Sequence, residues 1–403
     1  MKRTFIAAIL LLITAITLSS RRSEATADIV AFTHVNLIDG MSESPVLDAT
    51  VIVEGGLIKN VGKGAPPAGA RVIDLEGRWM LPGMIDAHTH IADLPAARAA
   101  LQSGVTTARN MGISHFVDLG IRDLNRAGVA EAPDMLSAGY HVYPRPAEDL
   151  FISLPQLHDL MGNLRGVANV RRMVKAQIER GVEFIKVNAT DRAGNPATDP
   201  RRQLYSFEEL SAIVDEAGRI PVAAHAHGDE GGYDAVRAGV RSIEHGTYLS
   251  EKTLALMKQR GTWLVPTIAT MAEMIEPRND VALQIRGKYM VPRLRETVRM
   301  AVRMGIRIAA GTDTDYTSTS NFRLANEVQE LVDCGMKPIE AIRAATVYSA
   351  ECAGIGARTG SIRPGLEADL IVVERNPLDD IVNLQEVLMV INNGKIAASR
   401  LAR

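Results

Sequence analysis

The sequence has few aromatic residues and almost no cysteine. Aromatic side chains make up 4% of the 403 residues, so a core must be built from Val, Ile, Leu, Ala and Met. Cys334 and Cys352 are the only cysteines, which excludes a disulfide framework and a four-thiolate zinc site and leaves open whether these two pair. A metal ion, if one is bound, must therefore be held by His, Asp, Glu or Lys.

The sequence also lacks an excess of charge of either sign. Its 45 Lys plus Arg stand against 47 Asp plus Glu, a formal charge of -2, so no strong basic field exists to hold a phosphate backbone. We therefore expect no nucleic-acid partner. With 46% hydrophobic residues, the chain is long enough for one large domain with an accessory domain.

Long hydrophobic runs are missing after the first residues. Residues 1–27 have the pattern of a secretory signal peptide: Lys2 and Arg3 come first, residues 5–18 are apolar, and Ala-Thr-Ala at 25–27 offers a cleavage site. The apolar run is shorter than the ~20 residues that cross a bilayer. We expect cleavage after Ala27, a secreted or periplasmic protein, and no stable membrane insertion afterwards. An uncleaved anchor is the alternative.

Short β-prone runs broken by turn signals occur at both ends of the mature chain. Residues 28–80 contain a hairpin signal at Gly55-Gly56, and residues 364–403 contain another at Asn393-Gly394. This pattern predicts one small β domain that both termini complete, with residues 81–363 enclosed between its two parts.

Residues 81–363 alternate apolar strand-like runs with amphipathic helices, which is typical of parallel sheets. Val167, Val170, Val174 and Ile178 recur at helical spacing, and Ser206 with Glu209 forms a capping box. The pattern predicts an α/β protein with a (β/α)8 TIM barrel. A doubly wound open sheet is the alternative, but no Gly-rich dinucleotide loop follows the first strand. Eight strand runs are expected, at residues 84–89, 105–110, 135–138, 183–187, 221–226, 242–245, 263–267 and 306–312.

Side chains that can bind a metal ion gather at the carboxyl ends of these runs. In a barrel all such ends meet at one mouth, where this fold builds its active sites. Each residue has a structural alternative: a satisfied core histidine, a helix cap or a surface lysine. Their joint placement at five strand ends nevertheless predicts a metal site. The candidates are His88, His90, Lys186, His225, His227, His245 and Asp313.

Loops near the expected mouth supply further candidates for binding a substrate. His141 follows the third predicted strand, in a segment that could enter the mouth. Tyr140, Arg145 and Tyr233 are weaker candidates, because such residues more often face solvent.

Six segments together resemble the amidohydrolase superfamily, especially its imidazolonepropionase-like and prolidase-like group, which includes Xaa-Pro dipeptidases. They are LPGMIDAHTHI, FIKV around Lys186, VAAHAHG, SIEHG, AAGTDTD and TGSIRPGLEADLIVV. The resemblance implies a (β/α)8 barrel with a β-sandwich domain formed by both termini. It also implies two divalent metal ions, with zinc the expected metal.

The resemblance further assigns a role to each candidate. His88, His90 and Asp313 would bind one ion, His225 and His245 the second, and a carboxylated Lys186 would bridge both. Asp313 would also transfer the proton during catalysis. The first His of HAH is the ligand in such enzymes, which leaves His227 for the substrate.

The sequence thus predicts a dinuclear metal-dependent hydrolase in which a bridging hydroxide attacks a carbon–nitrogen bond of a dipeptide or N-acyl amino acid. Its partner would be this small-molecule substrate, and a homo-oligomer is left open. One alternative is a mononuclear cyclic-amide hydrolase or deaminase, in which a bridging lysine is usually lacking. A lactone or carbamate hydrolase is a second alternative. A non-catalytic binding protein is a third, but no expected ligand is missing from this sequence.

Overall fold

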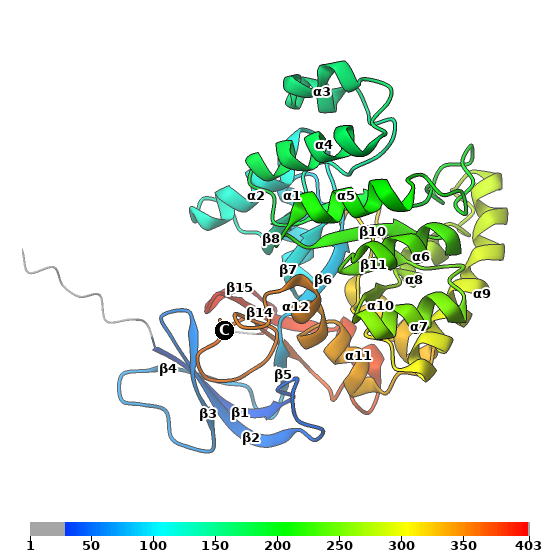
Figure 1. Ribbon diagram of the computed structural model, residues 1–403. Coiled ribbons are helices and arrows are strands. Elements are labelled where there is room, and N and C mark those ends of the chain that lie inside the picture. Colours follow the sequence, from blue (N-terminus) through cyan, green and yellow to red (C-terminus); the bar gives the residue numbers. More distant parts are fainter. Residues whose placement is uncertain (1–28, 402–403) are drawn as a thin grey trace, which may run out of the picture.

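The computed structural model describes residues 29–401, and the predicted signal segment 1–27 lies outside them. Within this range a β sheet occupies one end of the molecule, and parallel strands surrounded by helices form the rest (Figure 1). No helix of the described residues is long and apolar enough to cross a membrane.

Strands from both ends of the chain form one eight-stranded sheet. The two ends join where β5 and β13 pair antiparallel, with Leu370 opposite Pro82. Phe32 and Val51 from the first part pack with Leu370 and Ile391 from the last in one buried cluster. The strands of this sheet are β1 (Ile29–Leu37), β2 (Val46–Glu54), β3 (Leu57–Gly62), β4 (Arg71–Asp74), β5 (Trp79–Pro82), β13 (Leu370–Val373), β14 (Val387–Asn392) and β15 (Lys395–Ser399).

Both predicted hairpin turns are present. Gly55 and Gly56 connect β2 to β3, and both have positive φ, a conformation that glycine adopts without steric cost. Asn393 and Gly394 connect β14 to β15 in the same way.

Between the two parts of this sheet, the chain forms two parallel sheets in sequence order. The first has three strands and the second four, and each strand pairs with the next along the chain. A bridge between Val142 and Val187 connects the end of the first sheet to the second. The strands are β6 (Met84–Thr89), β7 (Val105–Asn110) and β8 (Asp134–Ser137), then β9 (Ile185–Asn188), β10 (Val222–Ala226), β11 (Ser242–His245) and β12 (Trp263–Val265).

The eighth expected strand, residues 306–312, does not form a regular strand. It makes isolated bridges instead, Ile308 with Leu264 on β12 and, just beyond the expected run, Thr314 with Thr89 on β6. The segment still lies close to β6, since a Cβ on Gly311 would be 2.9 Å from the His88 nitrogen. The seventh run also ends early, at Val265, because Thr267 takes a positive φ of 55° and begins the next helix.

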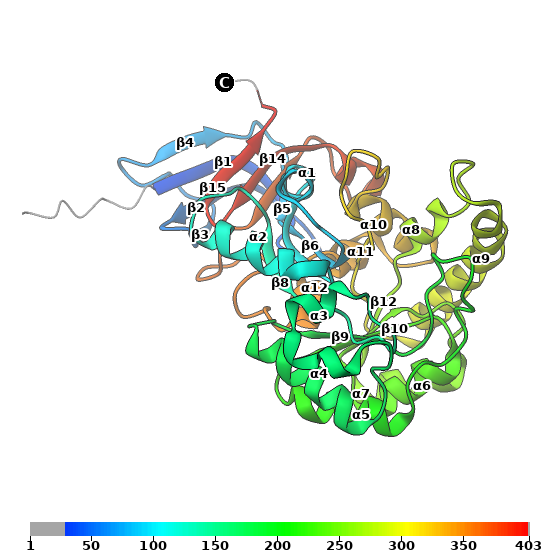
Figure 2. The same cartoon turned by 90° about the horizontal axis from the view of Figure 1, so that it is seen from above.

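Helices surround the parallel strands, as Figure 2 shows for α4 to α7 around β9 and β10. The predicted helix at Val167 is α4, and the capping box of Ser206 with Glu209 begins α5. The α-helices are α1 (Leu94–Gln102), α2 (Val117–Arg126), α3 (Asp149–Ser153), α4 (Val167–Glu179), α5 (Phe207–Ala217), α6 (Asp229–Ala238), α7 (Glu251–Arg260), α8 (Ile268–Glu273), α9 (Val281–Met304), α10 (Leu324–Asp333), α11 (Pro338–Ala344) and α12 (Val347–Ala353), with short 3-10 turns at Ser114–Phe116, Pro155–Leu160 and Ile381–Gln385.

Candidate metal centre

The end of β6 and the segment after residue 312 are held together by a buried carboxylate. Asp86 accepts hydrogen bonds from the Thr312 nitrogen (2.9 Å), the Thr312 hydroxyl (2.7 Å) and the Tyr316 hydroxyl (2.7 Å). The Asp313 nitrogen in turn donates to the His88 carbonyl at 2.7 Å. These bonds fix Asp313, whose φ of 59° is uncommon for a residue other than glycine, beside the end of β6.

Two histidines and an aspartate form the first histidine group: His88, His90 and Asp313. The two histidines lie two residues apart on β6, so their side chains point to the same side. The Oδ1 of Asp313 is 3.2 Å from Nε2 of His88 and 3.1 Å from Nε2 of His90. Burial opposes ionisation of Asp313, but the two histidines outweigh it and hold its pKa well below the ordinary value. The group therefore offers two imidazole nitrogens and one carboxylate.

Behind the first histidine group lies a buried ion pair. The outer nitrogen of His88, Nδ1, donates to Oε2 of Glu244 at 2.8 Å, and Arg109 donates to Oε1 at 3.0 Å. Burial raises the pKa of Glu244, but the Arg109 guanidinium and His88 more than offset it and lower the pKa to about 2. His90 is fixed differently, since its Nδ1 donates to the Gly112 carbonyl at 3.0 Å.

The second histidine group consists of His225, His227 and His245, from the ends of β10 and β11. Each has one ring nitrogen beside a fixed oxygen. For His225 it is the Asp191 carbonyl (3.1 Å), and for His227 and His245 the hydroxyls of Thr247 (2.8 Å) and Thr267 (2.7 Å). Burial lowers the pKa of His227 to about 3 and the pKa values of the other two well below the ordinary value. These imidazoles are neutral, the form that binds metal ions.

Lys186 lies at the same strand ends, on β9, and only 3% of it is exposed. Burial lowers its pKa to about 8, although the carboxylates of Glu244 and Asp313 oppose the shift. A much larger fraction of this amine is therefore neutral near pH 8 than for an ordinary lysine.

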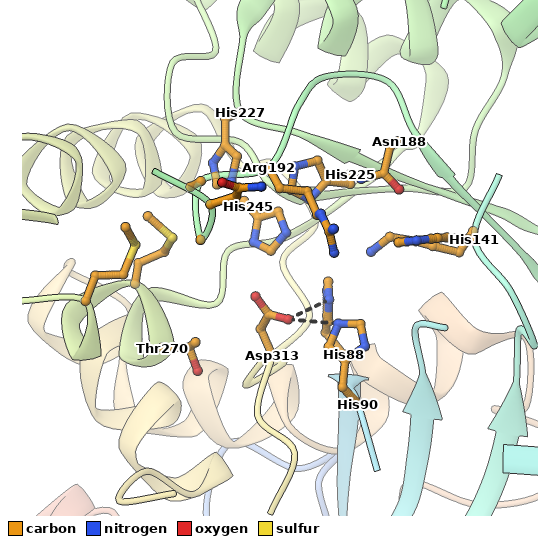
Figure 3. A pocket seen from close by; sticks show the side chains of 16 residues that line it. His88, His90, His141, Asn188, Arg192, His225, His227, His245, Thr270 and Asp313 are labelled. Atoms are coloured by element: carbon orange, nitrogen blue, oxygen red, sulfur yellow. Dashed lines mark ion pairs between the residues drawn. The ribbon is translucent and has the colours of Figure 1, made fainter. Parts of the chain in front are cut away.

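The two histidine groups and Lys186 line one cavity of about 350 Å³. In Figure 3 the first group lies below and the second above, and the rings of His88 and His245 are 5.1 Å apart. The other residues that line the cavity are His141, Asn188, Arg192, Ala193, Gly194, Asn195, Thr270, Met271 and Met274.

The donor atoms fit divalent metal ions. Within each group the three candidate ligand atoms all lie within 4.8 Å of one another. The outer nitrogens are occupied by Glu244, backbone carbonyls and threonines, which directs the remaining nitrogens toward the cavity. Imidazole and carboxylate ligands suit zinc and similar ions, so each group could hold one.

The structure brings together most of the predicted site residues. His88, His90, Lys186, His225, His227, His245, Asp313 and the loop residue His141 all line the cavity. Burial and the nearby charge of Arg192 lower the pKa of His141 to about 3, so this imidazole is neutral as well.

Three weaker candidates do not line this cavity. The Tyr140 hydroxyl contacts Asp149 and Ser153 instead, and Tyr233 lies under the ammonium of Lys252. Arg145 is exposed on the loop after β8. Cys334 and Cys352, whose pairing the sequence left open, are separate buried thiols.

Sequence reasoning missed Glu244, Arg109, Asn188 and Arg192. The first two offered the same signal as Lys186, a charged residue inside an apolar strand run that needs compensation. Their pairing could not be predicted, because Arg109 and Glu244 are 135 positions apart.

Parallel strands whose carboxyl ends unite five histidines, a lysine and an aspartate define an α/β enzyme with a candidate metal centre. Comparison with known proteins identifies its class. The model of the amidohydrolase family matches residues 79–397, so the chain belongs to the amidohydrolase family. It is a hydrolase that acts on carbon–nitrogen bonds, and the resemblance drawn from the sequence is confirmed.

Individual relatives cover nearly the whole chain. Ochratoxinase of Aspergillus niger is 31% identical over 87% of this chain and 82% of its own. Imidazolonepropionase of Pseudomonas putida is 26% identical over 84% of this chain and 90% of its own. A crystal structure of a Xaa-Pro dipeptidase with methionine in its active site has 28% identity and a TM-score of 0.84, covering 92% of this chain and 99% of that one.

Proposed function

We propose that this amidohydrolase uses two divalent metal ions, with zinc the expected metal, to cleave the amide bond of a dipeptide or N-acyl amino acid. The observation that carries the proposal is the pair of three-residue groups that face one cavity together with buried Lys186. Similarity to a Xaa-Pro dipeptidase supports a dipeptide-like substrate.

In this proposal His88, His90 and Asp313 hold one ion, and His225 and His245 hold the other. Lys186 would contribute to both after its neutral amine has added carbon dioxide and released a proton, because the resulting carbamate is anionic and offers two oxygens, whereas an ammonium would repel both ions. The lowered pKa of Lys186 favours this reaction by increasing the neutral fraction. Two bound ions would supply Lewis acidity, which activates water and polarises the substrate carbonyl.

The protein's own residues would handle the proton and the substrate. Asp313 is ionised and 23% of its side chain is exposed, so it can accept a proton from the attacking water and return it to the leaving nitrogen. His227 is neutral and can donate a hydrogen bond to a substrate oxygen, which is the role we assign to it. His141 on the opposite loop can do the same.

The alternative of a mononuclear cyclic-amide hydrolase has support from the similarity to imidazolonepropionase. Lys186 favours the dinuclear alternative, because burying an ammonium in the cavity wall is costly, whereas a lysine carbamate shared by two ions would be compensated.

We further propose the architecture that the sequence predicts. Bonds on both sides of residues 306–314 support closure of the parallel strands into a (β/α)8 barrel spanning residues 81–363. The sheet shared by both ends supports a separate β-sandwich domain from 28–80 and 364–403. Residues 1–27 would be removed on export to the periplasm or the medium, which N-terminal sequencing of the mature protein tests.

The function is tested by removing metal with a chelator, reloading the protein with zinc, manganese or cobalt, and screening dipeptides, N-acyl amino acids and lactones. We expect amide cleavage that depends on metal and is lost in Lys186→Ala, with fewer than two ions bound. Lys175→Ala on the exposed face of α4 is the control. Unchanged metal content and turnover in Lys186→Ala would refute the bridging role, and cleavage of lactones alone would refute the substrate class.

A further inference from the structure

One exposed arginine beside the candidate metal centre has a guanidinium without a hydrogen-bond or ion-pair partner in residues 29–401. Arg192 lines the cavity on the loop after β9, and its side chain makes no hydrogen bond or ion pair within the described residues. The adjacent carboxylate is not available, because Asp191 contacts Arg202 and accepts from the Tyr143 hydroxyl at 3.0 Å. The Arg192 guanidinium carbon lies 5.8 Å from the Tyr143 ring centroid.

The loop that carries Arg192 is held rigidly. Arg286 on α9 donates to the carbonyls of Ala193 (2.6 Å), Asn195 (2.7 Å) and Thr198 (2.7 Å), and also to that of Pro196. These hydrogen bonds from Arg286 restrain the backbone of the loop that carries Arg192. A restrained loop loses less entropy when a ligand binds to Arg192.

A second polar group in the same wall is Asn188, which ends β9 and is 1% exposed. Its side-chain amide makes no hydrogen bond within residues 29–401, and its oxygen is fully buried. Its backbone is fixed beside the His141 loop, because the Asn188 nitrogen donates to the Val142 carbonyl at 3.0 Å. The amide nitrogen of Asn188 can donate to a carboxylate in the cavity, whereas its oxygen, which only accepts, needs a donor such as an N–H group of the same ligand.

These groups lie on one side of the cavity. Figure 3 shows Arg192 and Asn188 on the side of His141, with Thr270 beyond Asp313. Thr270 and its neighbours Met271 and Met274 belong to α8 and the residue that follows it, which makes that wall largely apolar. The cavity therefore has a cationic side and an apolar side, with the two histidine groups between them.

We propose that Arg192, together with Asn188, binds the carboxylate of the amide substrate and so makes the enzyme select acids over neutral amides. The inference rests on the proposed function for the position of the scissile bond. A guanidinium with an amide N–H matches a carboxylate, and the charge of nearby Asp313 disfavours a dianion such as phosphate.

The test compares N-acetyl-leucine, N-acetyl-phenylalanine and N-acetyl-alanine with their neutral carboxamides, using metal-loaded protein. We expect Arg192→Met to lower kcat/KM for the acids about 30- to 100-fold, mainly through KM, and to change the carboxamides less than about threefold. Arg192→Lys should give a kcat/KM for the acids between those of the wild type and Arg192→Met. Asn188→Ala should lower kcat/KM for the acids about 5- to 10-fold. Arg201→Met, which removes a nearby exposed arginine, is the matched control.

A binding measurement separates this inference from the proposed function. Calorimetric titration with leucine and leucinamide needs no turnover, and Arg192→Met should weaken the binding of leucine alone. If the wild type cleaves no amide but shows this pattern, the proposed function fails and the carboxylate subsite stands. The role of Arg192 is refuted if Arg192→Met lowers kcat/KM equally for acids and carboxamides. It is also refuted if the wild type shows no preference for the acid over the amide in either the kinetic or the binding assay.

Discussion

The two histidine groups of the cavity use the same ligand type but rest on different supports. In the first, the outer nitrogen of His88 meets the ionised Glu244, whose charge Arg109 balances. In the second, the expected ligands His225 and His245 meet the Asp191 carbonyl and the neutral hydroxyl of Thr267. A carboxylate behind an imidazole increases its basicity more than a hydroxyl does, so the first group should bind its ion more tightly.

Two buried glutamates near the histidine groups also differ. Glu244 has Arg109 beside it, and its pKa falls to about 2. Glu327 on α10 accepts from the Ala269 nitrogen at the start of α8, the helix that follows Thr267. No cation of the described residues forms an ion pair with Glu327, and burial raises its pKa to about 8. The same residue type is therefore charged behind one group and neutral near the other, according to whether an arginine is buried with it.

The largest expected effect comes from the one carboxylate among the histidine-group residues. Asp313→Asn keeps the shape but loses the charge and the proton acceptor, so kcat/KM should fall by about 10³-fold or more. The neighbouring Asp315→Asn, on an exposed position, should change it little. Turnover above a tenth of the wild-type value in Asp313→Asn would show that another residue carries the proton.

Glu244→Gln should change the zinc affinity of the first histidine group and leave that of the second unchanged. It leaves Arg109 buried without a carboxylate, so the free energy of unfolding of the metal-free protein should fall by about 3 kcal/mol in a denaturant titration. Calorimetric titration should show the tighter zinc affinity reduced about 10- to 100-fold and the weaker one unchanged. Adding Arg109→Met should restore part of the stability. Equal weakening of both affinities would contradict the comparison.

Glu327→Gln tests the neutral state of the other glutamate. Because the folded pKa lies above the unfolded value, Glu327 contributes stability that is fully present below pH 4.5 and is lost as the pH rises through about 8. From pH 6 to pH 8 the wild type should therefore lose about 2 kcal/mol more unfolding free energy than Glu327→Gln. Parallel stability profiles of the two proteins would mean that Glu327 is ionised in the fold.

The smallest effect is expected from the hydroxyl behind His245. Thr267→Val removes one neutral hydrogen bond, so the weaker zinc affinity should fall about 5- to 10-fold while the tighter one stays the same. Thr267→Ser keeps the hydroxyl and should behave like the wild type. A loss as large as that of Glu244→Gln would show that the hydroxyl and carboxylate supports are equivalent.

Much of the first histidine group could be predicted from the sequence. His88 and His90 end an apolar run, and the period of two places both on one side of a strand. Lys186 stands out because a charge inside an apolar run demands compensation. Asp313 lines the cavity, although the strand expected before it is not regular and residues 306–312 make only isolated bridges.

The supports of both groups could not be predicted in the same way. Glu244 contacts His88 from a position 156 residues away, and no local pattern encodes such a pair. Thr267 was expected at the end of a strand, but it has a positive φ and caps the start of α8, and its hydroxyl lies 2.7 Å from Nδ1 of His245. Tertiary contacts decide both cases.

The most direct test is a crystal structure of the zinc-loaded protein with anomalous scattering recorded at the zinc edge, together with the zinc content per chain. We predict two ions per chain, one at each histidine group, with continuous density from the Lys186 side chain to both. A single ion per chain, or two ions beside an unmodified Lys186 that contacts neither, would contradict the account.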